Sequence, residues 1–278
     1  MNKRTCLYDK HVALGALIQP FGGFDMPIQY TNIIDEHKAV REHVGVFDVS
    51  HMGEIIISGH DAPRFVNHIF TNDVTKMKPG DVMYGMMCYE DGGTVDDTCV
   101  DMLEPNRYFM TVNAANVDKD SAWVHKQAEK FDVVVCYKSD WWNQLAIQGP
   151  EAEKTVTEVL HLPVSDLKFY QCKEVLRFDD SVIVSRTGYT GEDGFEVYGD
   201  KEYIRDAWDR LMRAGVKPCG LGCRDTLRFE VGLPLYGDEL SKDISPIMAG
   251  LGHFVDFDKP EFIGREALLK QKTEGVAK

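Results

Sequence analysis

The segment that combines the most reactive and turn-forming residues is 186–196, RTGYTGEDGFE, with three glycines, two aromatic and three acidic side chains. A helix is disfavoured here, because each interior glycine costs about 1 kcal/mol relative to alanine. The segment lies between the strand-like runs 181–185 and 195–198. We therefore predict a β-hairpin whose loop lets a ligand ring approach the backbone. The alternative is a glycine-rich turn with solvated acids.

A second candidate site is the run 91–100, DGGTVDDTCV, in which a Gly-Gly turn leads into a strand that carries two adjacent carboxylates. Successive strand side chains point to opposite faces, so Asp96 and Asp97 are expected to lie in different environments. The buried one needs a strong donor or a cation. It either forms a structural ion pair or interacts with a ligand proton, and the residues alone favour the structural ion pair.

A third candidate is the run 220–238, where Arg224 and Arg228 would lie one turn apart on a helix. Such a guanidinium can clamp a ligand carboxylate through two hydrogen bonds. The alternative is an Arg–Asp/Glu network that holds the helix. Near residue 50, His51 has no nearby nucleophile or second histidine at ligand spacing, which favours a hydrogen-bonded structural histidine. Met52 fits either a soft wall for a flat ring or core packing.

Composition limits the function classes. The 278 residues carry 31 Lys+Arg and 45 Asp+Glu, a formal charge of −14, which argues against a nucleic-acid partner. The seven cysteines include no Cys-x-x-Cys pair and are not spaced like metal ligands, so we expect no bound metal. Their odd number and scattered positions predict reduced thiols in a cytoplasmic protein. No apolar run resembles a signal peptide or approaches the roughly 20 residues of a membrane helix, so no membrane partner is expected.

Hydrophobic periodicity predicts short helices and short strands that alternate along the chain. Neighbouring strands are separated by short turns, which favours antiparallel hairpins and an α+β fold. Asn32 is available as an N-cap for the first predicted helix. The predicted helices are 33–44, 61–70, 117–130, 151–160 and 201–213; the predicted strands are 54–58, 95–102, 108–112, 133–137, 144–148, 174–178, 181–185 and 195–198.

A weak internal repeat relates residues 55–69 to residues 145–159. Each copy reads as a strand, a glycine, an acid–alanine pair and a helix. Each is followed by a tyrosine, further strands and a helix that bears a tryptophan, Trp123 in one copy and Trp208 in the other. The repeat predicts two similar α+β units, and a ligand site commonly lies between such units.

Taken together and in order, these motifs resemble the glycine cleavage system T-protein family, the tetrahydrofolate-dependent aminomethyltransferases. The resemblance runs from about residue 5 to the C-terminus. It rests on the runs 47–54 (FDVSHMGE), 92–97 (GGTVDD), 112–116 (VNAAN), 185–196, 220–225 (GLGCRD) and 262–268 (FIGREAL).

The resemblance implies an enzyme with two subdomains that form a folate cleft, approximately residues 54–137 and residues 1–53 with 138–245. Residues 246–278 would connect toward the family's C-terminal β-barrel domain, before which this chain is expected to end. The implied reaction moves a methylene group from the aminomethyl-lipoyl arm of the H-protein to tetrahydrofolate and releases ammonia. The implied partners are H-protein and tetrahydrofolate.

The resemblance also implies roles for single residues. Asp97 matches the family's catalytic aspartate, which stabilises an iminium-like carbon and manages a proton. Glu196 matches the glutamate that binds the pterin, and Arg224 a ligand-contacting arginine. The folate pocket would be lined by Met52, Tyr84, Asn113 and Tyr189, and the loop glycines would give clearance for the pterin.

Three other functions compete with this one. A folate-dependent demethylase of the same fold would share the folate residues but take another donor. A non-catalytic folate-binding relative of the iron–sulfur assembly type would carry a KGCYxGQE string, which this sequence lacks. A purely structural α+β module would leave Asp97, Glu196 and Arg224 without a common ligand.

Overall fold

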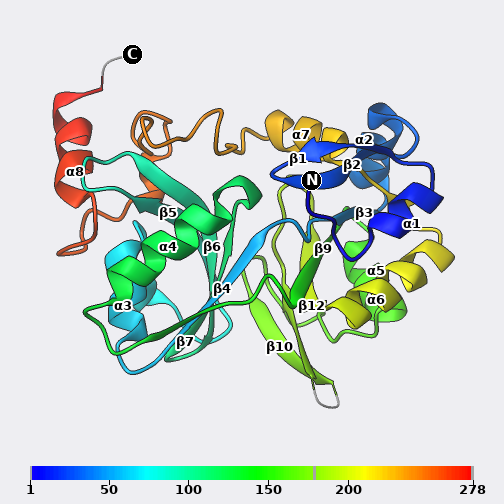
Figure 1. Cartoon of the computed structure of the whole chain (residues 1–278), viewed down its shortest axis with the longest axis horizontal. Helices are drawn as coiled ribbons and strands as arrows, with labels where there is room; N and C mark the ends of the chain where they lie inside the picture. Colours follow the sequence, from blue (N-terminus) through cyan, green and yellow to red (C-terminus); the bar gives the residue numbers. More distant parts are fainter. Residues whose placement is uncertain (1, 178–179, 277–278) are drawn as a thin grey trace. The chain divides into compact units, whose positions relative to one another are not determined.

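The computed structural model describes residues 2–177 and 180–276, and the chain divides into two compact units (Figure 1). The first unit contains Met1–Met52 and Ser139–Leu233, and the second contains Gly53–Lys138 and Pro234–Lys278. Residues 234–278, which we divided at position 245 from the sequence, group as a whole with the second unit.

The first unit is built on a sheet with the strand order β10-β11-β12-β9-β3-β13. Its neighbours are antiparallel except β3 and β13, which are parallel. A separate hairpin is formed by β1 and β2. The elements of this unit are α1 (Tyr8–Ala13), β1 (Leu17–Phe21), β2 (Phe24–Gln29), α2 (Ile33–Glu42), β3 (Gly45–Asp48), β9 (Trp142–Gln148), α5 (Ala152–Val159), β10 (Cys172–Arg177), β11 (Asp180–Ser185), β12 (Gly194–Asp200), α6 (Lys201–Arg213), β13 (Lys217–Pro218) and α7 (Leu221–Glu230).

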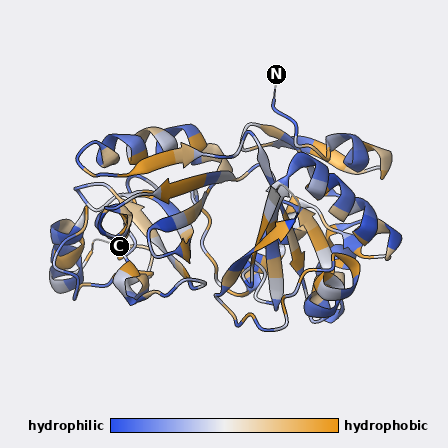
Figure 2. Ribbon diagram, turned by 90° about the horizontal axis from the view of Figure 1, so that it is seen from below, coloured by the Kyte–Doolittle hydropathy of each residue, from blue (hydrophilic) through white to orange (hydrophobic). Residues whose placement is uncertain are grey.

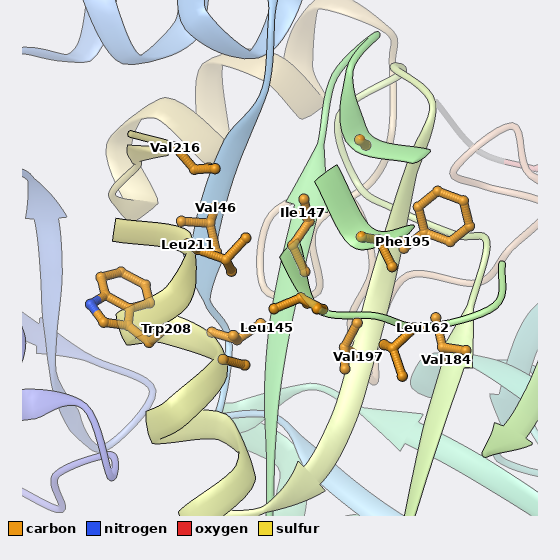
Figure 3. Close-up of a cluster of buried hydrophobic side chains, with 14 of the residues drawn as sticks. Val46, Leu145, Ile147, Leu162, Val184, Phe195, Val197, Trp208, Leu211 and Val216 are labelled. Carbon is orange, nitrogen blue, oxygen red and sulfur yellow. The ribbon is translucent and has the colours of Figure 1, made fainter. Parts of the chain in front are cut away.

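Helices cover both faces of this sheet. On one face α5 and α6 pack on β9 and β12, where Leu145, Ile147 and Phe195 join the buried cluster around Trp208 (Figure 3). On the other face a smaller cluster joins Ala146 to side chains of α2 and α7. The alternation of residues 145–147 between the two clusters follows from the two-residue period of a strand, which sends successive side chains to opposite faces.

The second unit is built on an antiparallel sheet with the order β5-β6-β7-β4-β8. On one face α3 and α4 pack over apolar strand residues, and a second cluster joins residues of β5 to the segment 234–278. Figure 2 shows the apolar colouring concentrated on the strands. The elements are β4 (Gly53–Ser58), α3 (Ala62–Ile69), η1 (Val74–Lys76), β5 (Val82–Cys88), β6 (Thr94–Glu104), β7 (Arg107–Val112), η2 (Ala114–Asn116), α4 (Val117–Ala128), β8 (Val134–Tyr137), η3 (Gly252–Phe254) and α8 (Arg265–Glu274).

The internal repeat predicted from the sequence is present in the topology. The succession β4-α3-β5-β6-β7-α4-β8 in one unit corresponds to β9-α5-β10-β11-β12-α6-β13 in the other, where β3 is inserted between β9 and β13. The glycine of each repeat has the same conformation, with φ of +133° at Gly59 and +128° at Gly149. A Cβ there would lie 2.6 Å from the Asp132 carbonyl oxygen and 2.4 Å from that of His43, so both turns require glycine.

The predicted helices and strands are confirmed, with ends that differ by up to two residues. Asn32 caps α2, because its side chain accepts from the Asp35 N–H at 2.9 Å. Residue 178, the expected end of one strand, lies outside the described residues. The elements α1, β1, β2, β3, β5 and β13 and the terminal helix α8 were not predicted. In the described ranges no helix is both long and apolar enough to span a membrane.

Candidate functional site

The glycine-rich segment forms the predicted hairpin connection between β11 and β12 in the first unit. The two strands are antiparallel, and Ser185 pairs with Glu196 at the base of the loop. Arg186 closes the loop through two hydrogen bonds to the Asp193 carboxylate, Nε to Oδ1 at 2.9 Å and Nη2 to Oδ2 at 2.6 Å. This bidentate pair holds the loop ends together, so the residues between them keep a fixed position on the strands.

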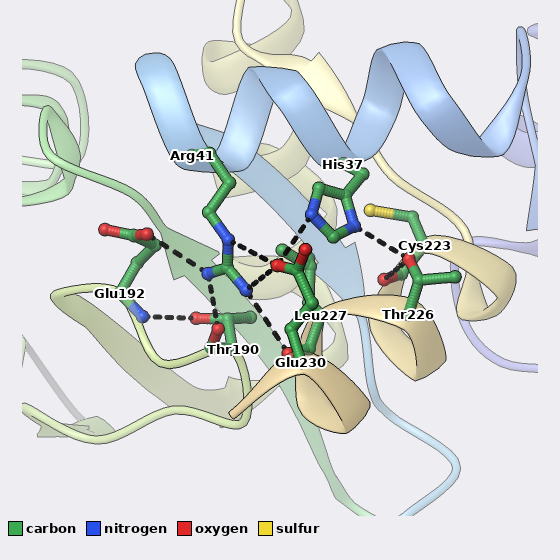
Figure 4. Close-up of polar contacts among 8 residues, drawn as sticks. All are labelled: His37, Arg41, Thr190, Glu192, Cys223, Thr226, Leu227 and Glu230. Carbon is green, nitrogen blue, oxygen red and sulfur yellow. Dashed lines mark hydrogen bonds and ion pairs between the residues drawn. The ribbon is translucent and has the colours of Figure 1, made fainter. Parts of the chain in front are cut away.

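Arg41 of α2 ties the loop to α7 (Figure 4). Its guanidinium donates to the Thr190 carbonyl oxygen at 2.6 Å and to Glu192 Oε1 at 3.1 Å on the loop. It also donates to the Leu227 carbonyl oxygen at 3.3 Å and to Glu230 Oε2 at 2.9 Å on α7. One side chain therefore sets the position of the hairpin loop relative to the helix that carries Arg224.

The loop glycines have a structural role that the sequence did not reveal. A Cβ on Gly188 would lie 1.9 Å from Oε1 of Gln148, and one on Gly194 would lie 2.4 Å from its Nε2. Gln148 is fully buried, donates to the Thr187 carbonyl oxygen at 3.0 Å and accepts from Thr190 Oγ1 at 2.8 Å. The expectation that these glycines give clearance for a ligand is wrong at both positions, because the Gln148 amide fills the space.

Glu196 lies on the face of β12 that packs toward α7. Its neighbour Phe195 points into the opposite core, as the two-residue period of a strand requires. The carboxylate accepts from Gln144 Nε2 at 2.9 Å through Oε1 and from Thr187 Oγ1 at 2.6 Å through Oε2. Each carboxylate oxygen has two lone pairs and uses one of them in these two bonds. The two bonds fix the orientation of the Glu196 carboxylate, and each oxygen can still accept a hydrogen bond from a ligand.

Arg224 and Arg228 share one face of α7 but have different surroundings. Arg228 is 5% exposed and donates to Asp225 Oδ1 at 2.8 Å and to the Leu233 carbonyl oxygen at 3.2 Å, which is the structural network we considered. The Arg224 guanidinium lies 4.7 Å from the Tyr189 ring centroid. Its buried Nη1 has no hydrogen-bond partner among the described residues. Burial lowers the pKa of Arg224, and the nearby Glu196 charge opposes that shift.

His51 and Met52 lie in the same unit as Arg224. His51 is 3% exposed and packs edge-on against Phe21, with ring centroids 5.5 Å apart. The expectation of a hydrogen-bonded histidine is wrong for Nδ1, which is buried without a partner among the described residues. Burial lowers the pKa of His51 to about 4, with the Arg224 charge acting in the same direction, so the ring is neutral at pH 7. Met52 is half-buried against the cluster that contains Cys223 and Leu227 of α7.

In the second unit, Asp97 receives hydrogen bonds from two other residues of the expected site. Tyr84 Oη donates to Oδ2 at 2.9 Å, and Asn113 Nδ2 donates to Oδ1 at 2.9 Å. The Tyr84 ring is itself fixed edge-on against Phe254, with centroids 4.7 Å apart. Burial and, to a lesser extent, the Asp96 charge raise the pKa of Asp97 to about 7 against the opposing effect of the two hydrogen bonds. At neutral pH this carboxyl can therefore either give or take a proton.

Asp96 faces the opposite side of β6 and is fully buried. It accepts from the Asn113 N–H at 2.8 Å, from Asn113 Nδ2 at 2.9 Å and from Asn116 Nδ2 at 2.7 Å. The expectation that Asp96 and Asp97 lie in separate environments is wrong in one respect, because Asn113 Nδ2 bonds to both. Asn113 follows the end of β7, beyond the last paired residues of the β6–β7 ladder, so its side chain reaches carboxylates on both faces.

The structure thus brings the expected residues together in two sets. Met52, Tyr189, Glu196 and Arg224 lie in the first unit, and Tyr84, Asp97 and Asn113 lie in the second. Sequence reasoning missed Gln144 and Gln148, although polar residues at alternate positions of an otherwise apolar strand were a readable signal. Within the described ranges, no three or more His, Cys, Asp or Glu side chains are arranged to hold a metal ion.

Comparison with known proteins identifies the family. The model of the GCVT N-terminal domain matches residues 7–259. The chain belongs to this family. Curated GCVT relatives include the aminomethyltransferases of Lysinibacillus sphaericus and Alkaliphilus oremlandii, 47% and 46% identical over 279 residues. These alignments cover 99% of this chain and 76% of each relative.

A solved GCVT structure agrees with the fold. The glycine cleavage system aminomethyltransferase T from Bartonella henselae superposes with a TM-score of 0.94 at 33% identity, over 99% of this chain and 76% of that one. The resemblance stated from the motifs is confirmed, and the chain is an enzyme of the aminomethyltransferase class.

Proposed function

We propose that this chain is the tetrahydrofolate-dependent aminomethyltransferase of a glycine cleavage system. Its substrates would be tetrahydrofolate and the aminomethyl-lipoyl arm of H-protein, and its products methylene-tetrahydrofolate, ammonia and the dihydrolipoyl arm. The observation that carries this proposal is the Asp97 carboxyl, whose pKa is raised to about 7 and which is held by Tyr84 and Asn113, in a chain of the GCVT family.

Asp97 would hold and move the proton of the reaction. Its hydrogen bonds from Tyr84 and Asn113 favour the carboxylate, whereas burial and the Asp96 charge favour the acid. Because these effects nearly balance at neutral pH, Asp97 can take a proton and later return it. It can also stabilise a cationic carbon while ionised. General acid–base catalysis of this kind contributes roughly 10²–10⁴-fold in rate.

The polar groups of the first unit fit a folate ring. Glu196 presents fixed acceptor oxygens, and the buried Nη1 of Arg224 lacks a partner among the described residues, as expected for a group that completes its bonding with a ligand. Tetrahydrofolate, when bound, supplies the nitrogen that accepts the methylene group. The roles of Met52 and Tyr189 would be apolar and aromatic contact with the ring.

The test is an H-protein-dependent assay of methylene transfer with Asp97→Asn. We expect turnover to fall by roughly 10²–10⁴-fold, since the amide keeps the shape of the side chain but cannot move the proton. Asp118→Asn, at an exposed position in the first turn of α4, is the matched control and should retain full turnover. Unchanged turnover in Asp97→Asn would refute the catalytic assignment.

The ligand assignment has a separate test. Glu196→Gln should weaken tetrahydrofolate binding about 10–100-fold, because hydrogen bonds to a charged group contribute about 1.5–3 kcal/mol. Glu158→Gln, on the exposed side of α5, is the control and should bind as the parent does. Turnover with other methyl donors but not with H-protein would instead assign the chain to the folate-dependent demethylases.

A further inference from the structure

A short segment, residues 70–72, lies against β5 next to the residues of the Tyr84–Asp97 hydrogen bond. Its middle residue, Thr71, is fully buried. The Thr71 N–H donates to the Met86 carbonyl oxygen at 2.9 Å, and the Met86 N–H donates to Thr71 Oγ1 at 3.0 Å. Met86 pairs with Asp97 in the β5–β6 ladder. Thr71 therefore holds the strand position directly opposite Asp97.

The residues on either side of Thr71 hold the rest of this part of β5. Asn72 Nδ2 donates to the Tyr84 carbonyl oxygen at 3.1 Å. The Phe70 ring lies against Gly85, where an added Cβ would come within 2.6 Å of it. Three consecutive residues of the segment thus contact three consecutive residues of the strand, and the strand backbone is fixed at the position that carries the Tyr84 side chain.

Thr71 also anchors the turn that carries Phe254. Its hydroxyl donates to the Phe254 carbonyl oxygen at 3.1 Å, and its carbonyl oxygen accepts from the Asp256 N–H at 3.0 Å. A hydroxyl has one proton and two lone pairs, so Thr71 Oγ1 can accept from Met86 and donate to Phe254 at the same time. The Thr71 side chain therefore joins β5 to η3 through two hydrogen bonds.

The Phe254 ring, placed in this way, supports the Tyr84 ring. The two rings meet edge-on with centroids 4.7 Å apart, a favourable geometry for an aromatic pair. Asp97 pairs with Met86, two positions along β5 from Tyr84, so Tyr84 and Asp97 are diagonal neighbours on one face of the sheet. Tyr84 Oη reaches Asp97 Oδ2, at 2.9 Å, because the Tyr84 side chain leans along the strand. Phe254 packs against the ring in that orientation.

Substitution of Thr71 or Phe254 changes no charged group around Asp97. Asp96 lies beside Asp97 on the same strand and raises its pKa. The elements packed around them contribute further charged or titratable groups: Asp73 and Lys76 at η1, Lys119 and Asp120 on α4, and Tyr236, His253, Asp256 and Lys259 in the segment 234–278. A changed titration of Asp97 in such a variant therefore reports the hydrogen bond from Tyr84 and not a new charge.

We propose that Thr71 and Phe254 are positioning residues for Asp97: together they hold the Tyr84 hydroxyl on the Asp97 carboxyl. The part that Asp97 plays in methylene transfer rests on the proposed function, but the support of this hydrogen bond does not. A hydrogen bond donated to a carboxylate favours its ionised form, and the Tyr84 bond lowers the pKa of Asp97. Loss of the bond should therefore raise the proton affinity of Asp97.

The proposal is tested without substrate or H-protein. The full chain is labelled with ¹³C at the aspartate carboxyl carbons, and the Asp97 signal is assigned by its loss in Asp97→Asn. Tyr84→Phe should raise the Asp97 titration midpoint by about one pH unit, a tenfold gain in proton affinity. Phe254→Leu should raise it by about half a unit, because the Tyr84 ring can then turn away from the carboxyl. Phe257→Leu, at another half-buried ring of the same cluster, is the matched control and should leave the midpoint unchanged.

A double variant shows whether Phe254 acts through Tyr84. In Tyr84→Phe no hydroxyl remains to be held, so the addition of Phe254→Leu should not move the midpoint further. An unmoved midpoint in Phe254→Leu alone would overturn the proposal. So would a shift of the same size in both backgrounds, which would show that Phe254 acts on Asp97 without the Tyr84 hydroxyl.

Thr71 is tested by a pair of variants. Thr71→Ser keeps the hydroxyl and should keep the parent midpoint, whereas Thr71→Val keeps the shape, loses both side-chain hydrogen bonds and should raise the midpoint as Phe254→Leu does. Equal midpoints in the two variants would refute the role of Thr71, and the Phe254 variants test the same support in a chain that retains Thr71. A raised midpoint in Phe254→Leu, with a parent chain that fails to transfer methylene, would support the positioning role and refute the proposed function.

Discussion

Gly188→Ala tests whether the loop glycine makes room for Gln148 or for a ligand. The added Cβ would lie 1.9 Å from Gln148 Oε1, well inside van der Waals contact. Gln148 cannot move cheaply, because it is fully buried and bonded to the Thr187 carbonyl oxygen and to the Thr190 hydroxyl. Overpacking of this kind costs about 1–3 kcal/mol, so we expect Gly188→Ala to lower the free energy of unfolding by that amount.

A double-mutant cycle isolates the contact. Gln148→Ala loses two buried hydrogen bonds and leaves their partners unpaired, for an expected cost of about 2–4 kcal/mol. In the double variant the new Cβ at position 188 occupies the space that the Gln148 amide filled, so Gly188→Ala should cause no further loss of unfolding free energy. The expected coupling energy is therefore about 1–3 kcal/mol in the favourable direction.

The assay is equilibrium urea unfolding followed by tryptophan fluorescence. Gly215→Ala is the control, because its φ of +80° adds strain but nothing lies within 4 Å of the new Cβ. Gly215→Ala should lower the free energy of unfolding by about 1 kcal/mol both in the parent chain and in the Gln148→Ala variant. The steric explanation is refuted if the two single costs simply add, or if Gly188→Ala keeps full stability while tetrahydrofolate binding weakens.

Three further predictions concern other contacts. The pKa of His51 falls from 6.5 to about 4 on folding, so the unfolded chain binds more protons between these values. Stability should then decrease as pH falls from 6.5 to 4, by at most about 1.4 kcal/mol per pH unit, and His51→Phe should flatten that slope in urea unfolding. Lys259→Met removes a buried ammonium group that is bonded to three carbonyl oxygens beside α3, and it should lower the free energy of unfolding by about 2–4 kcal/mol in thermal unfolding. Lys270→Met, at an exposed position, should change that free energy little. Arg41→Met should speed amide hydrogen exchange in residues 186–193, and unchanged exchange would contradict the role given to Arg41.

Local sequence patterns predicted much of the fold. The α+β class, the principal helices and strands and the repeat all follow from periodicity and turn residues, which act over a few neighbouring positions. The opposite orientation of Phe195 and Glu196 follows in the same way from the strand period. The strands β1 and β5 escaped prediction, because β1 contains a proline and β5 reads VMYGMMC, with an interior glycine and no alternation of polar and apolar residues.

The family motifs likewise predicted the candidate residues, because the residue types of a motif and their spacing can be read directly from the sequence. The motifs indicate Asp97, Glu196 and Arg224 from residue type and spacing alone. Sequence spacing did not distinguish Arg224 from Arg228, since both lie on the same helical face. Their partners decide the difference: Arg228 bonds to Asp225 and Leu233, whereas Nη1 of Arg224 has no bond within the described chain.

The tertiary structure alone decided what surrounds these residues. The glycine-rich segment was predictable as a hairpin loop, but Gly188 in that loop is required by Gln148, which lies 40 positions earlier at the end of β9. Asp97 was predictable as a candidate acid, but its pKa near 7 depends on burial and on an amide that it shares with Asp96. Sequence patterns record local geometry and residue type, whereas solvent exclusion and the pairing of distant polar groups arise only when the chain is folded.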